Sequence, residues 1–201
     1  MAKIAVDVVL LPPERIMDEA IEANRELLKH CPDKIVLDKE RCLPHISLAM
    51  GCIEEANIAG IKKILQCIAA NHSPGPLYTE AIQTGENAKN EKVSILQLRK
   101  TKQLQSLHEV VMRELRPYFS YNVSANSVLS PPAADEATLL WIRNYPEKSS
   151  FENFNPHITL GYGHIESFSF HPEFTAPKLA LCHLGNHCTC RKILISTTLQ
   201  S

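Results

Sequence analysis

An eight-residue pattern occurs twice in this chain, and this repeat constrains the fold more than any other feature. Residues 44–51 are PHISLAMG and residues 156–163 are PHITLGYG. Both copies follow the pattern Pro-His-Ile-(Ser/Thr)-Leu-x-x-Gly, which is too specific to recur by chance. We therefore predict an internal duplication, in which two lobes each contribute one copy to a shared cleft.

Each copy is typical of a β-strand whose two faces differ. Side chains two residues apart on a strand point to the same face, so His45 lies beside Ser47, and His157 lies beside Thr159. The alternate positions are apolar and face a core: Ile46, Leu48, Ile158 and Leu160. Two such strands brought together would surround one small volume with two imidazoles and two hydroxyls.

These four side chains suit phosphodiester chemistry. A neutral imidazole accepts a proton from water or a hydroxyl group, whereas a protonated imidazole donates one to the leaving oxygen. Hydroxyl groups can bind the non-bridging phosphate oxygens and stabilise the developing charge. We predict that His45 and His157 are the catalytic acid–base pair and that Ser47 and Thr159 bind the phosphate. This chemistry needs no metal or other cofactor, and we expect none.

A single His-x-Ser or His-x-Thr is usually incidental in a strand, so the prediction depends on the duplication. The other histidines lack this context and are expected to be structural or on the surface: His30, His72, His108, His164, His171, His183 and His187.

The paired motifs, HISL at 45–48 and HITL at 157–160, resemble those of the two-histidine phosphoesterase superfamily. That group includes the LigT-like 2′-5′ RNA ligases and the cyclic nucleotide phosphodiesterases. The resemblance implies a bilobal, pseudo-two-fold α+β fold with an active-site groove between the lobes. It also implies hydrolysis of 2′,3′-cyclic phosphates, or the making and breaking of 2′-5′ linkages in RNA. By the same analogy His45 is the proton donor and His157 the acceptor, although the residues alone fit either assignment.

Hydrophobic periodicity predicts a mixed order of helices and strands across the chain. The apolar pattern repeats at helical spacing in three segments, residues 13–30, 54–71 and 101–117. Strand-like segments are found at 3–12, 44–53, 77–84, 93–99, 137–144 and 155–163, and in a final hairpin over 178–199. Because the order lacks strict βαβ alternation, we predict an α+β fold with antiparallel sheets flanked by helices. No low-complexity linker divides the chain, so residues 1–201 are predicted to form one bilobal domain.

The charge balance limits the partners. The chain has 21 Lys and Arg against 22 Asp and Glu, a formal net charge of -1, whereas proteins that coat long nucleic acids carry a basic excess. We therefore expect a small nucleotide or an RNA terminus with a cyclic phosphate. The chain begins with a short strand-like run instead of a secretory signal and has no membrane-spanning stretch, so we expect a cytoplasmic monomer that does not bind membranes.

The tail segment CHLGNHCTC at residues 182–190 concentrates cysteine and histidine. A metal site is one interpretation, but the segment contains no Cys-x-x-Cys pair. We favour a buried hairpin with a two-residue turn at Gly185-Asn186, in which Cys188 and Cys190 share one face of a strand. The seven cysteines are odd in number and scattered, so we expect reduced thiols that fill apolar space.

Several other side chains have two interpretations each. Tyr162 directly follows the second motif, where it could stack on a base or pack within its own lobe. The single tryptophan, Trp141, is expected in the core because its neighbours are apolar. The basic run at residues 99–102 is expected to be solvated, with a phosphate-facing role as the alternative. Arg143 and Arg191 are further candidates for binding phosphate.

Hydrolysis of a cyclic phosphodiester is the predicted activity, because no ATP-binding loop is present to drive a ligation. One alternative is a non-catalytic module that binds nucleotides in the same groove. A second is a ligase or hydrolase that acts on 2′-5′ linkages in RNA. A third is a metal-binding regulatory protein built on the tail. Turnover of a nucleotide substrate distinguishes a binding module from an enzyme, and metal analysis of the purified protein tests the metal-binding alternative.

Overall fold

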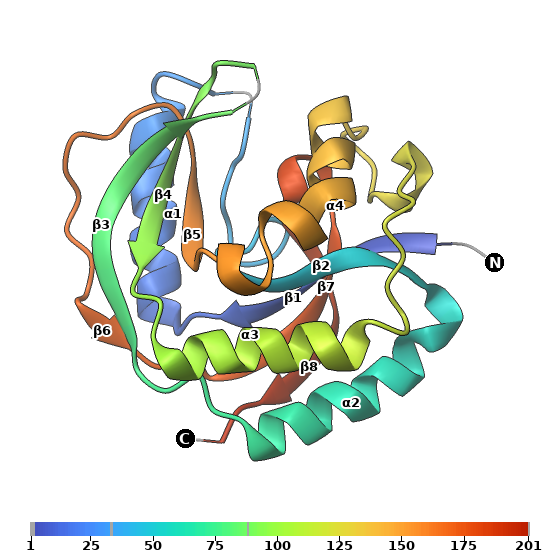
Figure 1. The fold of residues 1–201 in the computed structure, drawn as a ribbon. Coiled ribbons are helices and arrows are strands. Elements are labelled where there is room, and N and C mark those ends of the chain that lie inside the picture. Colours follow the sequence, from blue (N-terminus) through green and yellow to red (C-terminus); the bar gives the residue numbers. More distant parts are fainter. Residues whose placement is uncertain (1–2, 33, 88, 201) are drawn as a thin grey trace.

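The computed structural model describes residues 3–32, 34–87 and 89–200 of the chain. Within these residues eight strands form one sheet in the order β6-β3-β4-β5-β2-β1-β7-β8, with every neighbouring pair antiparallel (Figure 1). The strands are β1 (Lys3–Leu11), β2 (Ile46–Glu54), β3 (Leu77–Glu86), β4 (Lys92–Leu98), β5 (His157–Tyr162), β6 (Glu173–Phe174), β7 (Lys178–Leu184) and β8 (Cys190–Thr198). The helices are α1 (Glu14–Leu28), α2 (Ile58–Asn71), α3 (Lys102–Leu115) and α4 (Glu136–Lys148), and short 3-10 turns are η1 (Glu55–Asn57), η2 (Ala125–Ser127), η3 (Phe151–Asn153) and η4 (Asn186–Cys188). The prediction of an α+β fold with antiparallel pairing is confirmed.

The sheet has two halves that meet at the repeated motifs. The first half-sheet is β2-β1-β7-β8 and the second is β5-β4-β3-β6. The two halves are joined through β2 and β5, which pair at a single position, Ile46 with Ile158. Strands β1 and β2, in contrast, pair over most of their length. The two motif copies therefore lie next to each other at the centre of the sheet, as the predicted duplication requires.

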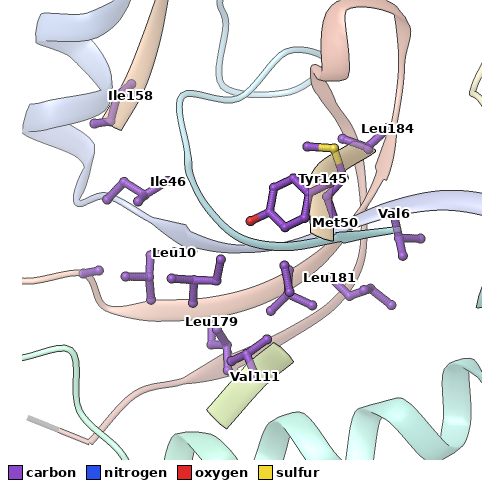
Figure 2. Packing of buried hydrophobic residues seen from close by; sticks show 14 of the residues in the cluster. Val6, Leu10, Ile46, Met50, Val111, Tyr145, Ile158, Leu179, Leu181 and Leu184 are labelled. Atoms are coloured by element: carbon purple, nitrogen blue, oxygen red, sulfur yellow. The ribbon is translucent and has the colours of Figure 1, made fainter. Parts of the chain in front are cut away.

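Helices cover the apolar faces. Helices α2 and α3 pack against each other and against the first half-sheet, and α1 packs on β5. In Figure 1 α2 and α3 lie below β1, β2 and β7, whereas α4 lies above β2. The core between the sheet and its helices is apolar (Figure 2) and includes Leu10, Ile46, Val111, Ile158, Leu179 and Leu181. No described helix is long and apolar enough to cross a membrane.

Residues 137–144 form part of helix α4, so the predicted strand there is wrong. The run LLWI looks like a strand because four apolar residues are consecutive, but the buried positions Leu139, Ile142 and Tyr145 follow helical spacing. Asp135 caps the helix by accepting a hydrogen bond from the Thr138 amide at 2.8 Å. Trp141 is 52% exposed, so its predicted place in the core is also wrong.

The final hairpin exists, but its connection differs from the prediction. Strands β7 and β8 are joined by residues 185–189, which contain η4 instead of a two-residue turn. His187 and Cys188 have φ angles of 59° and 54°, so the chain turns through two consecutive left-handed residues. Cys188 therefore lies in η4 and does not share a strand face with Cys190.

The expectation that the cysteines are reduced is wrong for two of them. Cys182 and Cys190 form a disulfide across β7 and β8. The other five are free thiols: Cys31, Cys42, Cys52, Cys67 and Cys188. The disulfide occupies two of the residues from which a metal site in the tail would be built. Among the described residues no group of three His, Cys, Asp or Glu side chains has the arrangement needed to hold a metal ion.

Candidate active site

The two motif copies bring their polar side chains to one face of the sheet. His45 immediately precedes β2, and His157 is the first residue of β5. Because Ile46 pairs with Ile158, the residues on either side of each isoleucine point to the opposite face. The sheet therefore gathers His45, Ser47, His157 and Thr159 where the two half-sheets meet. The histidines are close enough that the charge of His157 lowers the pKa of His45.

Both histidines are oriented in the same way by the backbone. Nδ1 of His45 donates to the Leu43 carbonyl oxygen at 2.7 Å, and Nδ1 of His157 donates to the Asn155 carbonyl oxygen at 2.8 Å. Each carbonyl belongs to the residue two positions earlier. Since a carbonyl oxygen only accepts, Nδ1 carries the proton of the neutral ring. Nε2 is then left free on both rings to exchange a proton.

Matching β-bulges lie at the same position in the two motifs. The pairing of β2 with β1 skips Leu48, and the pairing of β5 with β4 skips Leu160. A bulge adds one residue to one strand, so the side chains beyond it change face. Gly161 has a φ of 145°, and a Cβ there would lie 2.7 Å from Nδ2 of Asn24, so the second bulge requires glycine. Asn24 supports this bulge from α1 by donating to the Leu160 carbonyl oxygen at 2.7 Å.

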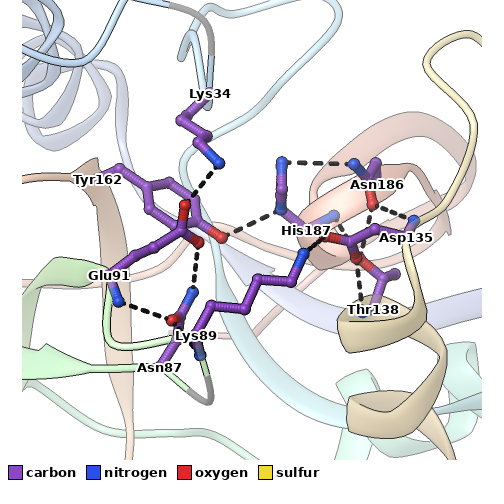
Figure 3. A network of polar contacts seen from close by, with 9 residues as sticks. All are labelled: Lys34, Asn87, Lys89, Glu91, Asp135, Thr138, Tyr162, Asn186 and His187. Carbon is purple, nitrogen blue, oxygen red and sulfur yellow. Dashed lines mark hydrogen bonds and ion pairs between the residues drawn. The ribbon is translucent and has the colours of Figure 1, made fainter.

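The second bulge places Tyr162 on the face that carries His157 and Thr159. Tyr162 pairs with Val93 and Thr159 pairs with Ile95, and Val93 and Ile95 share one face of β4. Figure 3 shows that the Tyr162 hydroxyl bonds to Nδ1 of His187 in η4, at 3.1 Å. The Lys34 ammonium group lies 5.0 Å from the centre of the Tyr162 ring.

A polar network surrounds Tyr162 and links the two half-sheets (Figure 3). Lys34 forms an ion pair with Glu91 at 2.8 Å. Lys89, in the β3–β4 connection, forms an ion pair with Asp135 at the start of α4, at 3.1 Å. Together with the bond between Tyr162 and η4, these contacts hold the tip of the second half-sheet against the first.

Burial keeps both imidazoles neutral. It lowers the pKa of His45 to about 4, an effect strengthened by the nearby His157 and partly opposed by the Leu43 carbonyl. Burial also lowers the pKa of His157, and the Asn155 carbonyl partly opposes that shift. In the free protein at neutral pH both Nε2 atoms are therefore proton acceptors.

Asp7 is a site residue that the motif analysis missed. It lies on β1, is 0% exposed, and its Oδ2 accepts a hydrogen bond from the Ser47 hydroxyl at 2.5 Å. The same oxygen is 3.9 Å from Nε2 of His45. Burial raises the pKa of Asp7 to about 8, opposed in part by the Ser47 hydroxyl and the nearby Ala49 amide. The signal available in the sequence was a lone carboxylate inside the apolar strand IAVDVVLL.

His108 is structural, as expected, and it supports both motifs. The side chain is fully buried on α3, where its Nδ1 donates to the Leu48 carbonyl oxygen at 2.6 Å. Its Nε2 accepts from the Phe151 amide at 2.7 Å, and its ring stacks on Phe154. Leu48 is the bulge residue of the first motif, and Phe154 lies three residues before His157. One neutral imidazole therefore connects the first motif to the segment that leads into the second.

The remaining candidates are not brought to the motif residues by any described contact. Arg99 forms an ion pair with Glu80, and Lys100 donates to the Glu152 carbonyl oxygen at 3.0 Å. Arg143 is exposed on α4, whereas the charge of Arg191 acts on the pKa values of Asp38 and Cys42.

The groove between the lobes stays a prediction. A surface pocket beside α1 contains none of the four motif residues and is lined by Asp18, Ile21, Glu22, Arg25, Leu37, Asp38 and Lys39.

Comparison with solved structures identifies the fold. TT0787 of Thermus thermophilus matches with a TM-score of 0.58 and 16% identity, covering 98% of both chains. E. coli LigT complexed with NADP+ matches with a TM-score of 0.55 and 13% identity, and the complex with 3′-AMP with a TM-score of 0.51 and 14% identity. These two matches cover 100% and 98% of both chains, respectively. This chain has the LigT fold.

The match to the LigT fold runs across the whole chain rather than one half of it. It also confirms, at the level of the fold, the resemblance to LigT-like two-histidine phosphoesterases that the paired motifs indicated. No protein-family model and no curated protein sequence matches the chain.

Proposed function

We propose that this protein is a phosphodiesterase that hydrolyses 2′,3′-cyclic phosphates of nucleotides or of RNA ends. One observation carries the proposal: two imidazoles, each with Nδ1 bonded to the backbone and Nε2 free, share a sheet face with two hydroxyls. This arrangement contains an acid, a base and two hydrogen-bonding groups for phosphate, which is a complete set for in-line displacement at phosphorus.

In the proposed reaction Nε2 of His157 takes a proton from water as the water oxygen attacks phosphorus. The bond from phosphorus to the 2′ or 3′ oxygen breaks, and that oxygen takes a proton from Nε2 of His45. The products are a phosphomonoester and a free hydroxyl. Ser47 and Thr159 bind the non-bridging oxygens. The donor and acceptor roles follow the resemblance to the two-histidine phosphoesterases.

The negative charge of the bound substrate favours the protonated imidazole that this reaction needs. One of the two imidazoles has to be protonated, but burial keeps both neutral in the free protein. A phosphodiester anion bound between them raises their pKa values, because an adjacent opposite charge stabilises the imidazolium ion. The complex would therefore bind a proton along with the substrate.

A small nucleotide fits the rest of the site. With a net charge of -1 the chain has no basic excess of the kind that proteins coating long nucleic acids carry. Solved structures of E. coli LigT hold 3′-AMP and NADP+, both nucleotides. Tyr162 shares the face of the proposed catalytic pair and is the candidate for stacking on the base. The base would then contact the same ring as the Lys34 ammonium group.

Turnover of a substrate panel tests this function. The purified protein is incubated in EDTA with the four 2′,3′-cyclic nucleotides and with 2′-5′-linked dinucleotides, and the products are identified by mass spectrometry and chromatography. We expect ring opening to one phosphomonoester isomer without added metal. Binding without turnover would instead identify a nucleotide-binding module. Cleavage confined to the dinucleotides would identify an enzyme for 2′-5′ linkages.

A further inference from the structure

The carboxyl group of Asp7 is buried on β1, the strand that pairs with the first motif. Asp7 pairs with Met50 on β2 and with Cys182 on β7, so it lies in the middle of a buried row across three strands. Helix α4 packs over this row, and Figure 2 shows the Tyr145 ring next to Met50. Asp7 has no contact with solvent, and its Oδ2 is bonded to the hydroxyl that we propose for phosphate binding.

The second motif has no such group, although its backbone is the same. Val9 opposes Ser47 and Ile95 opposes Thr159, and beyond the two bulges Asp7 opposes Met50 while Val93 opposes Tyr162. Val93 therefore takes the place of Asp7 in the second half. A duplicated strand pair needs an apolar residue at this point for packing, so the carboxyl of Asp7 is a departure that packing does not explain.

The Ser47 hydroxyl and the Ala49 amide stabilise the ionised form of Asp7, but burial outweighs them and the pKa is raised. Among the described residues its ion-pair contact is His45, whose own pKa is lowered, and no lysine or arginine forms an ion pair with it. Tyr145 on α4 and Cys188 in η4 also face it, and the charge of Asp7 helps to raise the pKa values of both. Cys182 on β7 is held in a disulfide and does not titrate.

The hydrogen bond between Asp7 and Ser47 exists in two arrangements that differ in what Ser47 can offer. An ionised Asp7 accepts the only hydroxyl proton of Ser47, so Ser47 presents lone pairs to an incoming phosphate oxygen. A neutral Asp7 donates its own proton to Ser47 Oγ, so the Ser47 proton becomes free to bind phosphate. Oδ2 is the Asp7 oxygen at hydrogen-bond distance from Ser47 Oγ, so a proton on Oδ2 is the one that would be donated.

We propose that Asp7 is a positioning residue that, as a neutral carboxylic acid, directs the Ser47 hydroxyl toward a bound phosphate and, when ionised, withdraws it. The inference rests on the proposed role of Ser47 in phosphate binding. Its consequence is a site that binds tetrahedral anions more weakly once Asp7 loses its proton. A carboxylate 3.9 Å from His45 Nε2 would add direct repulsion of the anion.

Anion binding as a function of pH tests the proposal without depending on turnover. Sulfate is the probe, because it mimics the shape of phosphate and keeps its charge between pH 6 and 9. Proton uptake at His45 and His157 makes the sulfate Kd rise with pH in any variant that keeps both histidines. With a pKa of about 8 for Asp7, the sulfate Kd of the unmodified protein should rise from pH 6 to pH 9 by a factor about ten times larger than that of Asp7→Asn. This variant keeps the shape and an N–H donor for Ser47 but cannot ionise. Asp18→Asn, which removes the same charge from an exposed position on α1, should behave like the unmodified protein.

A second measurement covers the case in which Asp7→Asn fails to fold. The side-chain carboxyl carbon of Asp7 in ¹³C-labelled unmodified protein is followed by NMR, and sulfate should shift its titration to higher pH. A sulfate Kd that stays flat in the unmodified protein, or that rises equally in Asp7→Asn, would overturn the proposal. Cyclic nucleotide turnover is measured on the same samples. Its absence, combined with the expected sulfate behaviour, would reject the proposed hydrolase function and keep the role of Asp7.

Discussion

In the first half of the site the strand paired with the motif carries the buried carboxyl group of Asp7, and in the second half the equivalent strand carries Val93. Both halves place a histidine against the carbonyl oxygen two residues earlier, and both have a bulge at the same motif position. The hydroxyls differ: Ser47 is bonded to Asp7, whereas Thr159 has no side-chain hydrogen bond among the described contacts. The two halves therefore share the groups that orient the imidazoles and differ in the group bonded to one hydroxyl.

This difference separates what each half is built to do. The shared backbone gives two imidazoles with Nε2 free, which the proposed reaction uses as one acid and one base. The unshared carboxyl makes the two hydroxyls unequal, because the availability of the Ser47 proton depends on Asp7 and that of Thr159 does not. Replacing either histidine should therefore have a similar effect on activity, whereas replacing Asp7 should change only the behaviour of Ser47.

The largest effect is expected from the histidines. His45→Ala and His157→Ala should each lower kcat/KM on a 2′,3′-cyclic nucleotide by about 10²- to 10⁴-fold, because each variant removes a group that moves a proton. The double variant should be little worse than either single one, since the pair works as a unit. His72→Ala, at the exposed end of α2, is the control. Near-normal turnover by either single variant would reject the paired acid–base mechanism.

The hydroxyls should show how the two halves differ. Ser47→Ala and Thr159→Ala should each lower kcat by about 10²- to 10³-fold, because each removes a donor to the phosphate. Stability should separate the two variants: Ser47→Ala leaves the buried carboxyl of Asp7 without its partner and should lower the free energy of unfolding by about 1–3 kcal/mol. Thr159→Ala should lower it by less. Urea unfolding at pH 6 measures both, and equal losses would mean that the bond to Asp7 contributes little.

Asp7 should also make the free energy of unfolding depend on pH, through a carboxyl group that only the first half contains. The carboxyl titrates near 3.8 in the unfolded chain and near 8 in the folded protein, so between these values folding takes up a proton. The free energy of unfolding therefore falls as pH rises, by up to about 1.4 kcal/mol per pH unit, and levels off above pH 8. Asp7→Asn lacks this dependence, so its stability relative to the unmodified protein should increase from pH 4 to pH 8. The lowered pKa of His45 destabilises both proteins equally at acid pH and cancels in the difference.

Local patterns in the sequence were enough to predict most of the strands and the placement of the motifs. Alternation and apolar runs locate β1, β2, β4 and β5, because each strand has one face or both in the core. The same rule fails at residues 137–144, where four consecutive apolar residues mimic a strand but only every third is buried. The left-handed residues in η4 are His187 and Cys188, which carry none of the usual turn signals.

The candidate site divides in the same way. The four motif residues are found from the repeat because the signal lies within eight residues of chain. Asp7 is 40 residues away from its partner Ser47, and helix α4, which packs over it, begins more than 120 residues after Asp7. No spacing rule connects these segments. Only the register of β1 with β2 and β7 shows that the carboxyl lies behind the first motif.

Tyr162 gives the smallest expected effect and tests the last difference between the halves, since Met50 takes its place in the first half. If a base stacks on the ring, Tyr162→Ala should raise KM about 5- to 150-fold with little change in kcat, which corresponds to a stacking free energy of about 1–3 kcal/mol. Tyr162→Phe keeps the ring and loses the hydroxyl that bonds to His187, so it should change KM less than about threefold. The decisive comparison uses a ribose 2′,3′-cyclic phosphate that has no base. Tyr162→Ala should leave its KM unchanged, and an equal rise on this substrate would show that the ring supports the site through packing rather than by stacking.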